Sequence, residues 1–346
     1  MRVRWLFLIA CSLGTSCAPE GTESVLVAVG EEGFSVGALD GDPSMTIGSI
    51  DDLAVGAAGE VIVVDGINSL VRRYNSSGSF DKAVGREGDG PGEFRRPSEV
   101  VVGPRGDLLI LDPGKWRLSR LSGDSLQFME TMDFPFLPRD ICLLGDRMFV
   151  LGLHAGLVLH EFSLEGELIG SFGDPIPYPV ANAVVQDDSQ FQSRLDDYSA
   201  SGDLVCHEAT ETLTVLPRTL PNLRNWSAQG TLRWEVVLED YSQTEVNRTE
   251  NGWTMGVNSE TGLATGLVSL VELSDDYLLT QTADGSYSIR PGEATVQSRV
   301  VSLATGEVRQ VVGDLPRLRK YVDGIGYGWE EVPFPRLFAI RVDVAY

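Results

Sequence analysis

Hydrophobic and polar positions repeat along this chain. Residues 52–65 read DLAVGAAGEVIVVD, and the same pattern begins again 47 residues later, where residues 99–112 read EVVVGPRGDLLILD. Each copy holds a short apolar run, a glycine turn, a second apolar run and an aspartate. Short strands and glycine turns at a period near 45 residues are typical of the blades of a β-propeller. The pattern therefore predicts an all-β protein.

Further glycine turns extend this pattern toward the C-terminus. Each is followed two residues later by an apolar residue, as expected for the outer hairpin of a blade: Gly78, Gly166, Gly230 and Gly306. The chain then divides into blades at about 48–95, 96–137, 138–182, 198–245 and 265–312. Residues 316–346 and a lone strand at 24–29 form the sixth, because an N-terminal strand commonly completes the last blade and removes its free edge. We predict a six-bladed β-propeller of four-stranded antiparallel blades over residues 24–346.

Two polar segments, 175–201 and 241–265, interrupt the blade pattern. We expect loops, the first with room for one helical turn, that emerge from a face of the ring. Long loops in a compact domain are usually functional or disordered. Trp253, inside the second segment, is the candidate ligand-binding residue, and solvated decoration is the alternative.

One inter-blade segment carries a family resemblance. Residues 85–100 read GREGDGPGEFRRPSEV, which resembles the segment between blades of NHL-repeat proteins. It is more closely similar to a bacterial family of six-bladed β-propeller proteins, many of them exported lipoproteins. Residues 72–74 and 117–121 resemble that family's third strand, and residues 335–342 its closing strand. The resemblance implies the fold and export, but it implies no catalytic residue, since the family has no single reaction.

The N-terminus has the features of an export signal. Two arginines precede a short apolar run, and small residues lead into Cys17. We predict a signal peptide at 1–16 and a linker at 17–23. The residues before Cys17 resemble the lipobox of bacterial lipoproteins, although a leucine is usual where Gly14 stands. Cys17 is therefore the predicted lipidation site, with Cys11 or simple secretion as alternatives. The expected location is the periplasm or outer membrane, with the lipid anchor as the protein's membrane contact.

The acidic composition of the chain limits the kinds of partner that we expect it to bind. The formal net charge of −23 opposes binding to nucleic-acid phosphates. Acidity favours cationic partners or divalent ions, and it is equally a general means of solubility. We expect the partner to be an envelope protein, a peptide or a glycan.

Two cysteines lie within the predicted blades, Cys142 and Cys206. They could pair in an oxidising compartment. The alternative, which we favour, is that both are small buried apolar residues.

Candidate catalytic chemistry is sparse. The spacing of His154, His160 and His207 matches no metal motif, so we expect surface or strand-end positions. Asp65 and Asp112 follow equivalent second strands and are expected to bond the backbone of a turn. Four acidic pairs lack the alternating spacing of calcium loops and are expected to be solvated: 51–52, 187–188, 196–197 and 275–276. Trp116, Trp226, Trp234 and Trp329 are expected in the core. We predict no catalytic residue, no metal ligand and no cofactor.

These observations favour a non-catalytic binding or protein-interaction module of the bacterial cell envelope. The ligand would engage the loops of one face or the mouth of the central channel. The alternative is a metal-dependent hydrolase or lyase, similar to lactonases, with an axial site that uses carboxylates such as Asp65 and Asp112. A purely structural envelope protein is a third possibility.

Overall fold

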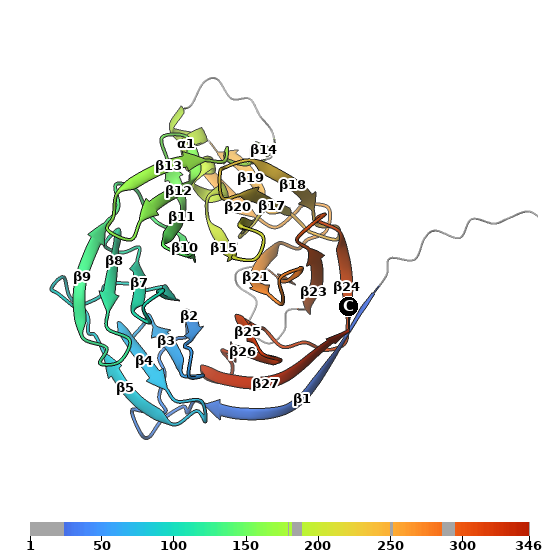
Figure 1. Ribbon diagram of the computed structural model, residues 1–346. Coiled ribbons are helices and arrows are strands. Elements are labelled where there is room, and N and C mark those ends of the chain that lie inside the picture. The colour runs from blue at the N-terminus through green and yellow to red at the C-terminus, as the bar shows by residue number, and fades with distance from the viewer. Residues whose placement is uncertain (1–23, 179, 182–188, 250–251, 286–294, 346) are drawn as a thin grey trace, which may run out of the picture.

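The computed structural model describes residues 24–178, 180–181, 189–249, 252–285 and 295–345. Figure 1 shows its sheets arranged radially around a central axis. The predicted signal peptide and the predicted linker lie outside the described residues.

Each blade is an antiparallel sheet whose strands follow one another from the axis outward. The strands of blades 1 and 2 are β2 (Asp52–Val55), β3 (Val61–Asp65), β4 (Leu70–Tyr74), β5 (Phe80–Val84), β6 (Glu99–Val102), β7 (Leu108–Asp112), β8 (Arg117–Leu121) and β9 (Phe128–Asp133). Those of blades 3 and 4 are β10 (Asp140–Leu144), β11 (Arg147–His154), β12 (Leu157–Ser163), β13 (Leu168–Phe172), β15 (Gly202–His207), β16 (Thr212–Pro217), β17 (Asn222–Ser227) and β18 (Leu232–Val237). Those of blades 5 and 6 are β21 (Thr265–Glu272), β22 (Tyr277–Asp284), β23 (Thr295–Ser302), β24 (Val308–Val312), β25 (Lys320–Val322), β26 (Ile325–Glu330), β27 (Arg336–Ala345) and β1 (Val25–Val36). The six predicted blades are confirmed.

The N-terminal strand closes the ring, as predicted. β1 pairs antiparallel with β27, from Leu26 opposite Ala345 to Val36 opposite Leu337. Its first residues also pair in parallel with β24, where Val25 lies opposite Val311. Blades 5 and 6 therefore form one continuous eight-stranded sheet. The outer edges of both blades are covered by this pairing, which removes two edges open to other chains.

The core lies between the blades, because successive side chains of a strand point to opposite faces of its sheet. In β3, Val63 packs with Trp329 of blade 6, whereas Ile62 packs with Ile110 of blade 2. Both faces of each blade are thus apolar, which explains the continuous hydrophobic runs of the sequence. Trp226 and Trp329 are buried as expected, but Trp116 is 48% exposed, so the core expectation is wrong for that residue.

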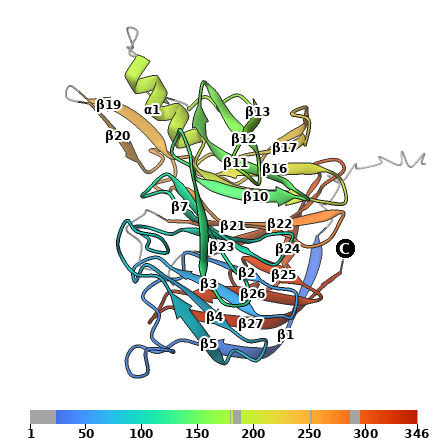
Figure 2. The same cartoon turned by 60° about the vertical axis from the view of Figure 1, so that its left-hand side comes forward.

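The two polar insertions form regular structure, contrary to the expectation of loops. The first contains β14 (Val180–Ala181) and helix α1 (Ser189–Ser199); the second contains β19 (Glu245–Thr249) and β20 (Gly252–Gly256). β14 pairs with β19, which pairs with β20. Phe191 and Leu195, one turn apart on α1, pack against Val246 of β19. The two segments therefore support each other, and Figure 2 shows them projecting together beyond the ring.

Candidate functional site

Acidic residues begin the inner strands of four blades. Asp52, Glu99 and Asp140 are the first residues of β2, β6 and β10, and Asp203 is the second residue of β15. Inner strands surround the axis of a propeller, so these carboxylates converge there, together with Arg319, which directly precedes β25. We call these five residues the axial cluster. Asp52 is thus buried and ion-paired, and the expectation of a solvated loop is wrong for it.

Arg319 lies at the centre of the axial cluster. Its Nε donates to Asp52 Oδ1 at 2.6 Å, one terminal nitrogen to Asp203 Oδ2 at 2.7 Å, and the other to Glu99 Oε2 at 2.8 Å. The planar guanidinium presents its donors in a rigid fork, which suits several carboxylates at once. One side chain of blade 6 therefore binds blades 1, 2 and 4.

The carboxylates of the axial cluster also join neighbouring blades. Asp52 Oδ2 accepts from the backbone N–H of Val100 at 2.9 Å, and Asp140 Oδ2 accepts from that of Leu204 at 2.7 Å. Asp203 Oδ2 accepts from the N–H of Leu270 at 3.2 Å. In each case the donor lies on the inner strand of the next blade. The cluster is therefore part of the structure that holds the ring together.

Burial and mutual repulsion shift the pKa values of these groups. Burial raises the pKa of Asp140 to about 7, against the attraction of Arg319, and the Asp203 carboxylate adds to the rise. Burial and the carboxylates of Asp140 and Asp52 likewise raise the pKa of Glu99 well above its usual range. Burial opposes the charge of Arg319, but the surrounding carboxylates raise its pKa well above the ordinary value. The raised pKa values of Glu99 and Asp140 favour their neutral forms, which limits the repulsion among the four carboxylates.

A cavity of about 530 Å³ extends from the axial cluster along the inner strands. Asp52, Asp140 and Arg319 line it where the strands begin. At the opposite end, where the strands turn back, its lining includes Glu208, Glu272, Asp275 and Asp323, whereas Lys320, the residue after Arg319, begins β25 at the first end. We call this space the axial cavity and its second end the acidic mouth. Between the two ends the lining is mostly apolar, formed by residues 100–102, 141–143, 204–206 and 270–273.

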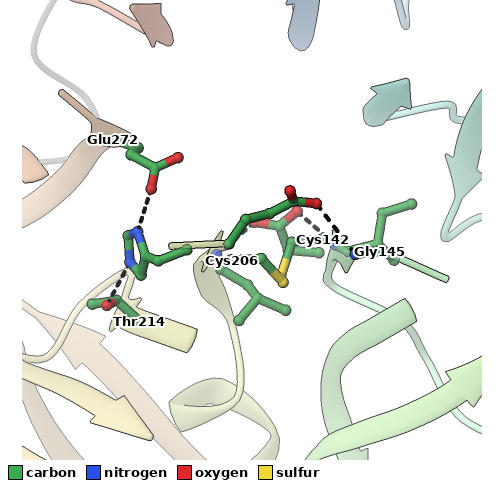
Figure 3. The surroundings of a disulfide bond; sticks show 10 residues. Cys142, Gly145, Cys206, Thr214 and Glu272 are labelled. Carbon is green, nitrogen blue, oxygen red and sulfur yellow. Dashed lines mark hydrogen bonds and ion pairs between the residues drawn. A yellow bond between two sulfur atoms is a disulfide. The ribbon is translucent and has the colours of Figure 1, made fainter. Parts of the chain in front are cut away.

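A disulfide bond forms part of the cavity wall. Cys142 of β10 and Cys206 of β15 are bonded, with their Cα atoms 5.6 Å apart. The bond joins the inner strands of blades 3 and 4, as Figure 3 shows. The favoured expectation of two unpaired cysteines is therefore wrong. The residues are 64 positions apart, and sequence alone does not reveal which inner strands lie side by side.

Two buried histidines, His160 and His207, make hydrogen bonds within and between strands near this wall. His207 lies between Glu272 Oε1, 3.0 Å from Nδ1, and Thr214 Oγ1, 2.9 Å from Nε2. His160, inside β12, bonds the carbonyl of Gly152, and burial lowers its pKa. His154 and His207 lie at strand ends as expected, whereas His160 does not. Across the described residues, no three His, Cys, Asp or Glu side chains are grouped to hold a metal ion.

The two aspartates considered for an axial enzyme site bond turn backbone instead. Asp65 accepts from the N–H groups of Gly48 and Ser49 and pairs with Arg72 Nε at 2.8 Å. Asp112 accepts from two successive N–H groups, at residues 95 and 96. Both side chains are fully buried. The structural interpretation of these two residues is confirmed, and neither belongs to the axial cluster.

Sequence reasoning missed the axial cluster, although a signal for it existed. Asp52 and Glu99 occupy the same position of the 47-residue repeat. An acidic residue at the start of successive inner strands could have been recognised as a feature of the axis. Of the two residues predicted as sites, Cys17 lies outside the described residues. Trp253 lies on β20, but its side chain is outside them.

Comparisons with known proteins agree with this architecture. The model of a family described as "6-bladed beta-propeller" matches residues 34–150. A crystal structure of a Bacteroides fragilis protein described as exported superposes with a TM-score of 0.56 at 10% identity, covering 92% of this chain and 96% of that one. A member of the DUF4221 family from Bacteroides vulgatus gives 0.55 at 12% identity, covering 94% and 97%. The chain is a six-bladed β-propeller, as its sequence resemblance predicts.

Two further findings complete the comparison. No curated protein matches the sequence. Within the described residues, no helix combines the length and apolar character needed to cross a membrane.

Proposed function

We propose that this protein is a non-catalytic binding module of the bacterial cell envelope that takes its ligand into the axial cavity. The observation that carries the proposal is the cavity itself. Its volume of about 530 Å³ falls within the range of roughly 300–1,000 Å³ that small-ligand sites occupy. Apolar walls with charged groups at both ends are also the usual composition of such sites.

Export and a lipid anchor at Cys17 form the second part of the proposal. The signal-like N-terminus supports it, and so does the Cys142–Cys206 bond, because disulfides persist mainly in oxidising compartments. The Bacteroides fragilis protein of the same fold, described as exported, agrees with this location. The ligand would then be an envelope component or a molecule that reaches the envelope.

Binding rather than catalysis is favoured by the state of the buried acids. Asp52 accepts hydrogen bonds on both oxygens, from Arg319 and Val100. Asp140 also accepts on both, from the N–H groups of Ile141 and Leu204. Carboxylates engaged in this way hold blades together, which supports a structural role for them. The enzyme hypothesis built on Asp65 and Asp112 is not retained, since both are bound within turns.

A ligand screen with an occluded cavity tests the proposal. Small molecules and short peptides would be screened by saturation-transfer NMR against the wild type and against Val322→Trp. Val322 lines the cavity and is 41% exposed, so the added indole can fill the space without displacing the core. Val237→Trp is the matched control, because Val237 is 59% exposed on the outer strand β18.

We expect ligands that bind the wild type and Val237→Trp but not Val322→Trp. Ligands that bind all three proteins equally would place the binding site elsewhere. A folded wild type that binds nothing in the screen would contradict a small-ligand site in the cavity.

A further inference from the structure

We propose that the axial cavity binds an ammonium or guanidinium group carried on an aliphatic stem, as at the end of a lysine or arginine side chain. This inference rests on the proposed function and adds the chemical class of its ligand. The cavity supplies the space, and the distribution of charge and apolar surface along it selects the ligand.

Charge is unbalanced along the cavity lining. Six acidic and two basic residues line it: Asp52, Asp140, Glu208, Glu272, Asp275, Asp323, Arg319 and Lys320. Arg319 is already bound by three carboxylates within 2.8 Å. It therefore presents little positive charge to a ligand, and the excess of acidic residues is concentrated at the acidic mouth, where a cation would enter.

The acids of the mouth keep capacity for a ligand. Within the described part of the chain, no ion pair includes Asp275 or Asp323, and both are exposed. Glu208 accepts on Oε1 from the N–H of Gly145 at 3.2 Å, and Glu272 contacts His207 through one oxygen. These carboxylates come from the consecutive blades 4, 5 and 6, so they line one half of the opening.

Apolar walls specify the rest of the ligand. Behind the mouth the inner strands contribute residues such as Val102, Leu143 and Val205 to the cavity lining. Lysine and arginine side chains bury their methylene stems against apolar surface while the charged end keeps polar contacts. A small hydrated ion would gain nothing from these walls. The combination therefore favours an organic cation over a metal ion.

The axial cluster should report the arrival of a cation. Asp140 faces Arg319, Asp203, Asp52 and Glu99, and its pKa is about 7. A positive charge in the cavity favours the ionised form and lowers that pKa. Binding near pH 7 should therefore release protons, which calorimetry detects as a heat that depends on the ionisation enthalpy of the buffer.

Matched peptides test the inference. The probes are acetyl-Ala-Lys-Ala-amide and acetyl-Ala-Arg-Ala-amide, with glutamine and glutamate versions as controls, and spermidine as a free amine. They would be titrated into the wild type and the mouth variant Glu208→Gln/Asp275→Asn/Asp323→Asn. A control variant, Asp40→Asn/Asp124→Asn/Glu165→Gln, removes the same charge from exposed positions that do not line the cavity.

We expect the basic peptides to bind the wild type and the control variant, and to lose affinity on the order of tenfold or more in the mouth variant. Tighter binding of spermidine than of either peptide would identify a free amine as the ligand source, and the reverse would identify a peptide. Equal binding to both variants would overturn the inference, because attraction would then come from overall charge. Displacement of the peptides by Ca²⁺ at constant ionic strength, with direct Ca²⁺ binding, would also overturn it.

The proposed function fails in a distinguishable way. If neutral or acidic ligands bind the wild type and are lost in Val322→Trp while the basic peptides do not bind, the cavity is a binding site and the cationic class is wrong. If Val322→Trp leaves every ligand unaffected, the cavity is not the site.

Discussion

Replacing Arg319 should destabilise the ring more than replacing any exposed arginine. In Arg319→Met the side chain keeps most of its length but loses its charge and its donors. The carboxylates of Asp52, Glu99 and Asp203 then lose ion pairs of 2.6 to 2.8 Å. They remain buried around the axis together with Asp140, so repulsion replaces attraction at the point where four blades meet.

The magnitude follows from the cost of leaving buried charge without its partner. Removing one member of a buried ion pair typically costs about 3–5 kcal/mol. Three carboxylates share the single cation here, which places the expected loss at the upper end. Protonation of the carboxylates limits the cost, because a buried acid without a partner takes up a proton instead of remaining charged.

This protonation makes the loss depend on pH. In the variant, loss of the Arg319 charge raises the pKa values of Glu99 and Asp140 further above their unfolded values, so the folded state binds more protons than the unfolded state over that interval. Unfolding free energy then falls as pH rises through the interval. The loss caused by Arg319→Met should therefore be larger at pH 8 than at pH 5.

Urea denaturation followed by tryptophan fluorescence at the two pH values measures the effect. Arg117→Met is the matched control, since Arg117 pairs with Asp133 at 2.7 Å on the surface and both side chains are partly exposed. Exposed pairs of this kind contribute about 0.2–1 kcal/mol. An equal loss for the two variants, or a loss for Arg319→Met that is the same at pH 5 and pH 8, would refute the electrostatic argument.

Three further predictions concern single features of the chain. In the wild type, the folded-state pKa of about 7 for Asp140 makes the folded protein bind one more proton than the unfolded chain between about pH 4 and pH 7, so the free energy of unfolding falls as pH rises through that window. Asp140→Asn should make this fall smaller. Thermal melting across the pH range measures it, and an unchanged slope contradicts it. The double variant Cys142→Ala/Cys206→Ala should lose roughly 4 kcal/mol of stability, the loop-closure value for residues 64 apart; urea unfolding checks this against the wild type with and without a thiol reductant. Cys17→Ser should abolish labelling by a radioactive fatty acid and membrane sedimentation, whereas Cys11→Ser should not; the opposite result would assign the lipid to Cys11.

Blade architecture could be predicted from residues alone because a blade is a local structure. Its strands follow one another along the chain and pair with their nearest neighbours, so alternating apolar runs and glycine turns carry most of the information. The predicted blade at 48–95 contains strands from Asp52 to Val84, and the one at 265–312 ends at the last residue of β24. The closing strand was also predictable, because an unpaired edge on the last blade would be unfavourable.

The insertions were less predictable because their order depends on contacts between distant segments. Neither segment alone has a strong periodic pattern. Phe191 and Leu195 of α1 are buried in a cluster that includes Val246 of the other insertion, so the helix depends on contacts that its own segment does not supply. Polarity on the exposed side of each segment led to the expectation of loops.

The fold and the prediction of export follow from local patterns, but the site depends on closure of the ring. Asp52, Glu99, Asp203 and Arg319 come from four blades, and no short-range pattern links Arg319 to an aspartate 267 residues away. The Cys142–Cys206 bond depends in the same way on blades 3 and 4 standing side by side. The axial acids lie at the start of their inner strands, and these strands meet only when the ring of blades closes. Closure of the ring buries the axial carboxylates beside one another and encloses the cavity between the inner strands. Tertiary structure therefore decides where a ligand can bind.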